Sequence, residues 1–384
     1  MSVEIVPVTN DAELERFIRV PMTLNASDPN WVAPLMFERR EALSPKHNPF
    51  FDHAQVQFWL ARKDGRDVGR ISAQIDALAK TDPEAPAGHF GLIAAENDPE
   101  IFAALLSTAE AWLRERGRKQ ILGPFNLSIN EEVGLLIDGF DTPPMLMMGH
   151  DPRYAGARIE EQGYAKAKDV YAYISGVPVF PRAVERRLSK PLPAGMSVRP
   201  VRMKEFDAEV RTLVGIMNDA WANNWGAAPV TEAETKQVGE SLRLILHPKL
   251  IWFVEIDGEA AGFGVLLPNL NDAIHDIGGR LVPFGWAKLL WRLKVRGVKR
   301  GRVPLMGIRR KFARDPRGAF APFLILDAFR REGPKLGITE AEYSWILEDN
   351  MPMRHILEGF GAHIYKTYRI YGKSLAAAPV SPAP

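Results

Sequence analysis

A cluster of polar residues near position 345 has the residue types that proton transfer requires. Glu342 and Ser344 occupy alternate positions of a predicted strand, so both side chains should face one side of a sheet. Glu348 follows that strand, and Asn350 opens the next predicted helix. A carboxylate beside an apolar channel has a raised pKa and accepts a proton from a nucleophile. The sequence therefore predicts a catalytic site at Glu342, Glu348 and Asn350. The alternatives are exposed carboxylates and, for Asn350, a plain helix N-cap.

A basic segment that precedes a predicted helix has the composition of an anion-binding loop. The free N–H groups and the dipole at a helix N-terminus attract phosphate. The helix is expected to begin near Ala319, and Asp315 is the one acidic residue of the segment 307–319. A solvated basic turn is the alternative interpretation. We expect the phosphates of a cofactor to bind at Arg309, Arg310, Arg314, Arg317, Gly318 and Ala319.

A second polar group lies in the first half of the chain, within an otherwise apolar stretch. It consists of Asn126, Asn130, Glu131 and Glu132. Such side chains either line a site that two domains share or cap a turn. We expect Asn126, Asn130, Glu131 and Trp345 to contact the substrate or to lie between the domains.

The segment 277–314 carries twelve Lys and Arg residues and no acidic residue, whereas the rest of the chain carries a formal charge of −10. A basic block on an acidic body indicates an anionic partner. Tryptophan beside Lys and Arg on a predicted helix is typical of a membrane interface. We therefore expect an anionic membrane surface to contact Trp286, Leu290, Trp291 and Lys294. The alternatives are packing on the core, binding of cofactor phosphates, and binding of nucleic acid, which we do not expect.

The composition is that of a globular protein with enough apolar residues for two cores. The chain has 384 residues, of which 46% are hydrophobic and 25% charged. It has no cysteine, which excludes disulfides and a catalytic thiol, and with no cluster of histidines no metal site is predicted. No leader pattern and no apolar stretch of about 18 residues occurs. We expect a cytoplasmic protein, with peripheral attachment to the inner membrane as an open alternative.

Proline-rich sequence divides the chain into two parts of similar length. We expect an N-terminal domain at 1–176, a linker at 177–196, a C-terminal domain at 197–375 and a disordered tail at 376–384. The acidic stretch 96–100 stands where the second domain has its basic loop. Because acidic residues repel phosphate, the first domain is not expected to bind the cofactor.

The two parts repeat one plan. Residues 59–69 align with residues 252–262 at an offset of 193, and each reads as a hairpin with an Asp-Gly turn. Four residues near the end of the first part match four near the end of the second at an offset of 198: Glu160, Gly163, Lys168 and Tyr173 match Glu358, Gly361, Lys366 and Tyr371. The order of elements predicts a mixed α/β sheet with helices on both faces.

This order and the strand–Asn–helix–Gly stretch at 342–362 resemble the GNAT acyltransferase superfamily, in a tandem, duplicated form. The ending Lys366-Thr-Tyr-Arg-Ile-Tyr371 resembles a narrower group of bacterial double-GNAT proteins. That group includes the bacterial ceramide synthases, which are similar in the motif GPFNLSINEEVG at 123–134. The resemblance covers nearly the whole chain. It implies an acyltransferase that uses acyl-CoA, with the second domain catalytic, and an amine acceptor on a lipid.

The resemblance also shows where this chain departs from its relatives. Many GNAT enzymes carry a tyrosine acid four residues before the helix-ending glycine, but Leu357 and Ile159 stand at those positions. The acid must come from elsewhere: Tyr371 is the candidate, with Tyr368 or water as the alternatives. Phe320 likewise stands where the phosphate loop usually has its second glycine.

The function expected from the sequence is transfer of a fatty acyl group from acyl-CoA to a sphingoid base, which gives a ceramide. Two alternatives remain open. One is a tandem-GNAT peptidyl transferase that uses aminoacyl-tRNA, and the other is a non-catalytic protein that binds lipid or nucleotide. The acyl-chain length, the exact amine and the oligomeric state do not follow from the sequence.

Overall fold

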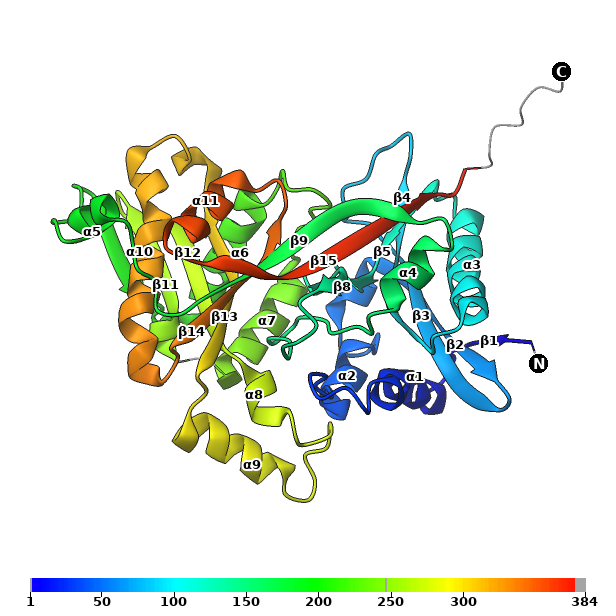
Figure 1. Cartoon of the computed structure of the whole chain (residues 1–384). Helices are drawn as coiled ribbons and strands as arrows, with labels where there is room; N and C mark the ends of the chain where they lie inside the picture. The colour runs from blue at the N-terminus through cyan, green and yellow to red at the C-terminus, as the bar shows by residue number, and fades with distance from the viewer. Residues whose placement is uncertain (1, 246, 377–384) are drawn as a thin grey trace.

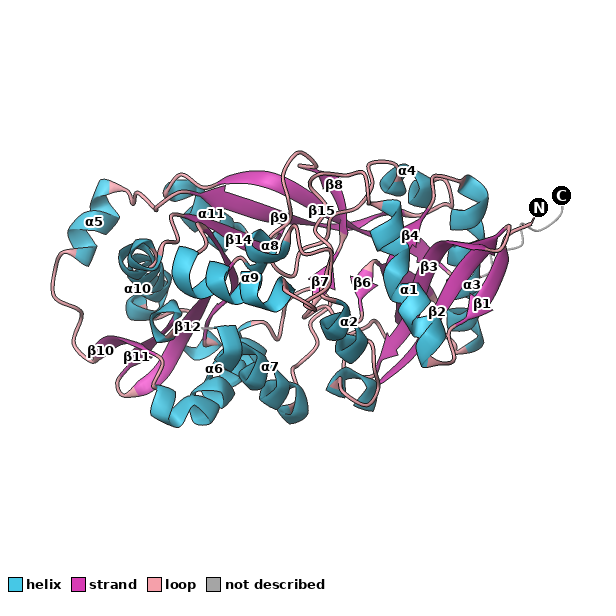
Figure 2. Cartoon of the chain, turned by 90° about the horizontal axis from the view of Figure 1, so that it is seen from below, coloured by secondary structure: helices cyan, strands magenta, loops and turns pink. Residues whose placement is uncertain are grey.

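One continuous mixed sheet runs through both halves of the chain (Figure 1). The computed structural model describes residues 2–245 and 247–376. Residues 377–384 of the tail expected at 376–384, and the side chain of Lys294, lie outside this described part. Within it, thirteen strands form the large sheet, and helices cover both faces (Figures 1 and 2). The predicted α/β fold class is therefore confirmed.

The first half supplies the strands and helices up to Ser175. Its strands are β1 (Glu4–Pro7), β2 (Ala54–Lys63), β3 (Arg66–Asp76), β4 (Ala87–Ala95), β5 (Gln120–Gly123), β6 (Phe125–Asn126), β7 (Glu132–Val133), β8 (Leu135–Asp138) and β9 (Ala165–Ser175). Its helices are α1 (Asp11–Leu24), α2 (Met36–Ala42), α3 (Pro99–Glu115) and α4 (Ala155–Glu160). Helix α5 (Arg182–Leu188) lies in the connection to the second half.

The second half repeats the same order of elements. Its strands are β10 (Met196–Pro200), β11 (Ile251–Ile256), β12 (Glu259–Pro268), β13 (Arg300–Ile308), β14 (Glu340–Leu347) and β15 (His363–Ser374). Its helices are α6 (Phe206–Ala220), α7 (Glu232–Ile245), α8 (Leu270–Ile274), α9 (Gly285–Trp291), α10 (Pro316–Glu332) and α11 (Met351–Gly359). Residues 269–299, which we call the insertion, separate β12 from β13.

The repeated turn and cap signals have the expected local structures. Both Asp-Gly pairs adopt positive φ, with Asp64 at 54° and Asp257 at 52°, so each hairpin closes as its sequence predicts. Asp98 caps α3 through the Glu100 N–H, with Pro99 in the first turn. The helix expected near Ala319 begins three residues earlier, because Asp315 and Pro316 form the same cap-and-proline pair.

The two halves exchange their last strands. The strand order reads β5-β15-β9-β14, so β15 pairs with β5 of the first half, and β9 pairs with β14 of the second. Figure 1 shows β9 and β15 crossing the middle of the molecule side by side. Consequently Tyr371 packs in the apolar core of the first half and Tyr173 in that of the second.

Hydrogen bonds reinforce this exchange in a reciprocal way. The Tyr173 hydroxyl donates to Glu358 on α11 at 2.7 Å, and the Tyr371 hydroxyl donates to Glu160 on α4 at 3.2 Å. These four residues are among those that match at an offset of 198. The match at an offset of 198 thus corresponds to two equivalent helix–strand contacts, and each contact joins one half of the chain to the other.

Candidate active site

Strands β13 and β14 separate in the middle of the second half. They pair in parallel from Arg300 with Glu340 to Val303 with Tyr343, and beyond this point each pairs only with its outer neighbour. Pro304, the first residue after the last pair, has no N–H to continue the ladder. The result is an opening between two adjacent strands, where their backbone groups no longer pair with each other.

A buried polar network lies at the root of this opening. Glu342 has no accessible surface, and Arg302, its partner in strand register, is 3% exposed. Arg302 Nε lies 3.6 Å from Glu342 Oε1 and donates to Ser344 Oγ at 2.8 Å. The Ser344 hydroxyl donates to Glu342 Oε1, and the Tyr365 hydroxyl donates to Glu342 Oε2. Two hydroxyl donors and one cation, from three strands, therefore surround one carboxylate.

Burial dominates the electrostatics of this network. It raises the pKa of Glu342 above the ordinary carboxyl range, although Arg302, Ser344 and Tyr365 act in the opposite direction. Burial also lowers the pKa of Arg302. Lys366, which donates to the Thr142 carbonyl at 2.7 Å, has its pKa lowered to about 8 for the same reason. Glu342 therefore takes up a proton more readily than an exposed glutamate.

A cavity of about 130 Å³ lies between the two halves beside this network. Trp345, three residues after Glu342, lines it, together with Ile129 and Asn130 of the first half. Most of the remaining wall comes from residues 221–231, the connection between α6 and α7, which we call the strap. The strap contributes Trp221 and Trp225, so the cavity is walled mainly by aromatic and apolar side chains.

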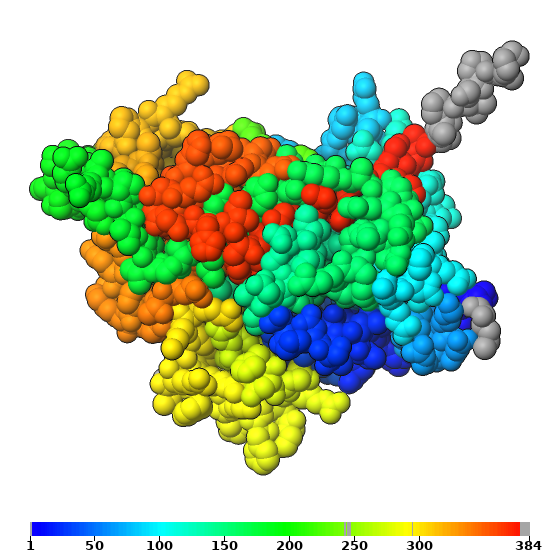
Figure 3. Space-filling view, in the orientation of Figure 1, coloured from blue at the N-terminus to red at the C-terminus, as the bar shows by residue number. Residues whose placement is uncertain are grey.

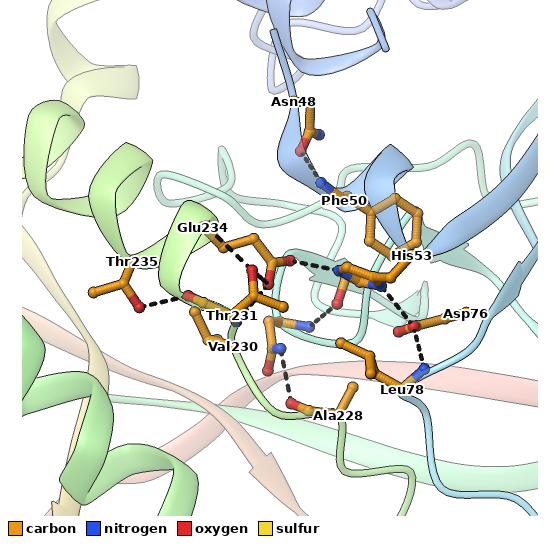
Figure 4. A network of polar contacts seen from close by, with 12 residues as sticks. Asn48, Phe50, His53, Asp76, Leu78, Ala228, Val230, Thr231, Glu234 and Thr235 are labelled. Carbon is orange, nitrogen blue, oxygen red and sulfur yellow. Dashed lines mark hydrogen bonds and ion pairs between the residues drawn. The ribbon is translucent and has the colours of Figure 1, made fainter. Parts of the chain in front are cut away.

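The first half holds the strap in place. The Asn130 side chain donates to the Ala228 carbonyl at 3.0 Å, and the Lys80 N–H donates to the Ala227 carbonyl at 3.1 Å. Figure 4 shows His53 between Asp76 of the first half, at 2.9 Å, and Glu234 at the start of α7, at 3.4 Å. The cavity therefore exists only when both halves are assembled.

The equivalent opening in the first half is filled by its own chain. Strands β4 and β5 pair only as far as His89 with Leu122. Beyond that point, β6 enters the gap, and Asn126 accepts a hydrogen bond from the Leu92 N–H at 2.7 Å. A Cβ on Gly91 would lie 1.7 Å from the Phe125 carbonyl oxygen, so the two backbones are in close contact.

The residues predicted in the first half occupy two different places. Asn130 lines the cavity, whereas Asn126 holds β6 and donates to Glu132 at 2.9 Å. Glu131 is half-buried by accessible surface, yet the protein around its carboxyl raises its pKa to about 8 through desolvation. Of the predicted group, Asn130 and Trp345 therefore meet at one site.

The structure does not bring the four predicted catalytic residues together. Glu348 forms an ion pair with Lys166 of β9 at 2.6 Å, and Asn350 caps α11 through the Met353 N–H. Glu342 and Glu348 are six residues apart, with most of that interval in β14, so about 20 Å separates them along the extended chain. Tyr371 contacts α4 in the first half. Glu342 alone of the four lies at the opening.

The predicted phosphate segment lies at the start of α10, directly after β13. Most of its cations have carboxylate partners: Arg310 pairs with Asp219, Lys311 with Glu259, and Arg317 with Asp315 and Asp257. Gly318 allows a close approach, because a Cβ there would lie 2.0 Å from the Phe312 carbonyl oxygen. Ala319 follows in the first turn of α10. Among the described ion pairs, Arg314 has none, and its side chain is exposed.

Large apolar side chains are exposed on the insertion, which protrudes from one side of the molecule (Figures 1 and 3). Its exposed members are Val282 (81%), Phe284 (78%), Trp286 (53%), Leu290 (45%), Trp291 (53%) and Val295 (71%). Within the insertion, Asp276 pairs with Arg292 at 2.6 Å and with Lys288. In the described residues, every helix is too short or too polar to cross a membrane.

Three residues at the site were not predicted as catalytic: Arg302, Tyr365 and Lys366. The alternation of β14 identified one face of that strand, but nothing local indicates that β15 of the exchanged pair contributes Tyr365 to it. Leu357, which stands where GNAT enzymes often have an acidic tyrosine, is fully buried in the second core. A hydroxyl at this site therefore comes from a strand and not from that helix.

Comparison with known proteins gives two close relatives. The chain is 57% identical to the bacterial ceramide synthase of Caulobacter vibrioides over 373 residues, which is 97% of each chain. It is 44% identical to protein YghO of Escherichia coli, over 95% of this chain and 94% of that one. No family model matches the chain.

Solved structures agree with the fold. A tandem GNAT protein from the clavulanic acid biosynthesis pathway aligns with a TM-score of 0.56 at 15% identity, over 98% of this chain and 100% of that one. A GCN5-related N-acetyltransferase from Sphaerobacter thermophilus aligns with a TM-score of 0.51 at 12% identity, over 98% and 96%. The predicted tandem GNAT fold is therefore confirmed.

Proposed function

Because the chain belongs to the family of the bacterial ceramide synthase, and is an acyltransferase with the GNAT fold, we propose that it joins a fatty acyl group from acyl-CoA to the amine of a sphingoid base. The product is a ceramide-type lipid. The observation that carries this proposal is the aromatic-walled cavity beside the β13–β14 opening, with the buried Glu342 network at its root.

The two halves have different roles in this proposal. Residues 197–375 bind the acyl thioester in the β13–β14 opening, where the backbone groups of the two strands no longer pair with each other. Residues 1–176 bind no cofactor, because β6 occupies their equivalent opening. Instead they hold the strap over the cavity, which receives the amine acceptor. Residues 177–196 connect the two halves.

Phosphates of acyl-CoA fit only part of the predicted loop. The loop lies at the correct edge, because it follows β13 and opens α10. However, Asp315 already accepts from the Arg317 N–H at the helix start, and four carboxylates neutralise most of the surrounding cations. Arg314 is therefore the residue we assign to the phosphates first, with Arg309, Arg310, Arg317, Gly318 and Ala319 shaping the loop.

The experiment that tests the function follows both products of the reaction. Purified protein is incubated with palmitoyl-CoA, with and without sphinganine on anionic vesicles, and free thiol and N-acyl lipid are measured together. Amine-dependent thiol release with an N-acyl product is the expected result. Absence of transfer across several chain lengths and amines would remove acyl-CoA as donor, and aminoacyl-tRNA would then be tested in the same way.

We also propose that the insertion places the enzyme on a membrane whose surface is anionic. Its six exposed apolar side chains match the apolar face of an interfacial helix, and the exposed Arg280, Arg296 and Lys299 of the insertion supply cations beside them. Leu290 lies within this face. The lipid amine then enters the enzyme from the membrane surface that α9 contacts.

Replacing Trp286 and Trp291 together by alanine should weaken binding to anionic vesicles. Each tryptophan buries enough apolar area for about a tenfold effect, because full burial of a large apolar side chain is worth about 1.5–3 kcal/mol. Co-sedimentation with vesicles measures the change, and thermal unfolding should be unaltered because both side chains are exposed. Val179→Ala, which removes an exposed apolar side chain from the connection between the halves, is the matched control. Equal sedimentation of the double variant and the wild type would contradict the proposal.

A further inference from the structure

Four tyrosine hydroxyls in the described part of the chain donate to glutamate carboxylates. The pairs are Tyr164 with Glu110, Tyr173 with Glu358, Tyr371 with Glu160 and Tyr365 with Glu342. The first three tyrosines pack in the two cores, and each bonds a glutamate on a helix. The fourth lies at the root of the β13–β14 opening, where the strands of the second half separate.

Tyr365 connects this opening with the cavity. It packs against the same apolar cluster as Trp225, Ala228 and Trp345, which line the cavity. Glu342 has no accessible surface, whereas the Tyr365 side chain is only partly buried. Of the two, Tyr365 is therefore the side chain that a substrate at the opening reaches first, and the Glu342 carboxylate lies behind it.

We propose that Tyr365 is the catalytic hydroxyl of this enzyme and that it relays protons between the reacting atoms and Glu342. The proposal rests on the proposed acyl transfer. The proton donor then lies on the exchanged strand β15, and not at the helix position where Leu357 stands.

The relay balances the reaction in two steps. First, the amine nitrogen bonds to the thioester carbonyl carbon, and its proton passes to the Tyr365 oxygen as the Tyr365 proton moves to Glu342 Oε2. Second, the carbon–sulfur bond breaks, Tyr365 gives its proton to the departing thiolate, and Glu342 returns its proton to Tyr365. The products are an amide and a free thiol, and both side chains end as they began.

The network favours transfer in both directions. Ser344 and Arg302 occupy the Oε1 side of the Glu342 carboxylate, which leaves Oε2 to Tyr365. Burial raises the pKa of Glu342, so it accepts a proton more readily. Burial and the neighbouring carboxylate also raise the pKa of Tyr365, so its hydroxyl remains protonated between turnovers.

The test compares Tyr365→Phe with Tyr164→Phe, Tyr173→Phe and Tyr371→Phe, which each remove one hydroxyl from a tyrosine–glutamate pair. We expect Tyr365→Phe to lower kcat by about 10²- to 10⁴-fold, the range for loss of a general acid–base. Binding of a non-hydrolysable acyl-CoA analogue, measured by calorimetry, should be unchanged. The three control variants should keep kcat within a few fold.

Two further readouts separate a relay from a structural role. The dependence of kcat on Glu342 protonation should disappear from the pH profile of Tyr365→Phe. The double variant Tyr365→Phe/Glu342→Gln should be no slower than the slower of the two single variants, because the two groups act as one unit. If the losses multiply, or if Tyr365→Phe retains kcat within a few fold, the relay is wrong while the acyl transfer stands. A wild-type enzyme without transfer activity would overturn the proposed function and the relay together.

Discussion

Neither half of this protein should fold when it is produced alone, whereas the two pieces co-expressed should form a stable complex. The reason is the exchange of β9 and β15. Without the second half, the first loses Tyr368, Ile370, Tyr371 and Leu375 from its apolar clusters. Four buried side chains at about 1.5–3 kcal/mol each correspond to roughly 6–12 kcal/mol, which is comparable with the whole stability of a domain.

The measurement uses a protease site placed at 190–194, where the connection between the halves is largely exposed. After cleavage, the two fragments should elute together and unfold in one transition. The fragment 1–176 produced alone should expose apolar surface and bind a dye that reports it. A monomeric, cooperatively folded fragment, with β9 beside β5, would show that the exchange is optional.

Replacing Arg302 by methionine should destabilise the protein by about 3–5 kcal/mol, because it leaves the buried Glu342 charge without its partner. Arg302 also donates to the Leu146 carbonyl at 2.9 Å and to the Ser344 carbonyl at 3.1 Å. Methionine leaves both acceptors unsatisfied, which adds to the cost. Few single substitutions in this chain should have a larger effect.

The loss of stability in Arg302→Met should depend on pH. The folded-state pKa of Glu342 is already raised by burial, and removal of the cation raises it further. The folded state then binds a proton that the unfolded chain, with a pKa of about 4.3, releases. Stability must therefore fall as the pH rises above that value. Urea unfolding at pH 5 and pH 8.5 should show the larger loss at pH 8.5.

Two variants serve as controls for this prediction. Arg302→Met/Glu342→Gln should regain part of the stability and lose the pH dependence, because no buried charge remains. Arg16→Met breaks an ion pair with Asp67 that is 38% and 21% exposed, and such pairs contribute only about 0–1 kcal/mol. A loss for Arg302→Met that is equal at both pH values would mean that Glu342 is neutral in the folded enzyme.

The elements and their duplication follow from the sequence alone. The Asp-Gly turns are local signals, since each depends on residues a few positions apart, and the offsets of 193 and 198 come from matching the two halves of the chain. One boundary differs from the prediction. Helix α10 begins at Pro316 and not near Ala319, because Asp315 caps it and Pro316 occupies its first turn. The alternation of side chains along a strand likewise puts Glu342 and Ser344 on one face.

How these elements share a site depends on contacts between distant parts of the chain. Strand exchange takes Tyr371 away from Glu342 and brings Tyr365 to it, although both lie in one strand, because β15 crosses from one half to the other. The cavity likewise needs Asn130 of the first half and Trp345 of the second. Pairing between distant strands follows from the packing of whole faces and not from the neighbours of any residue, so the site could not be derived from the sequence alone.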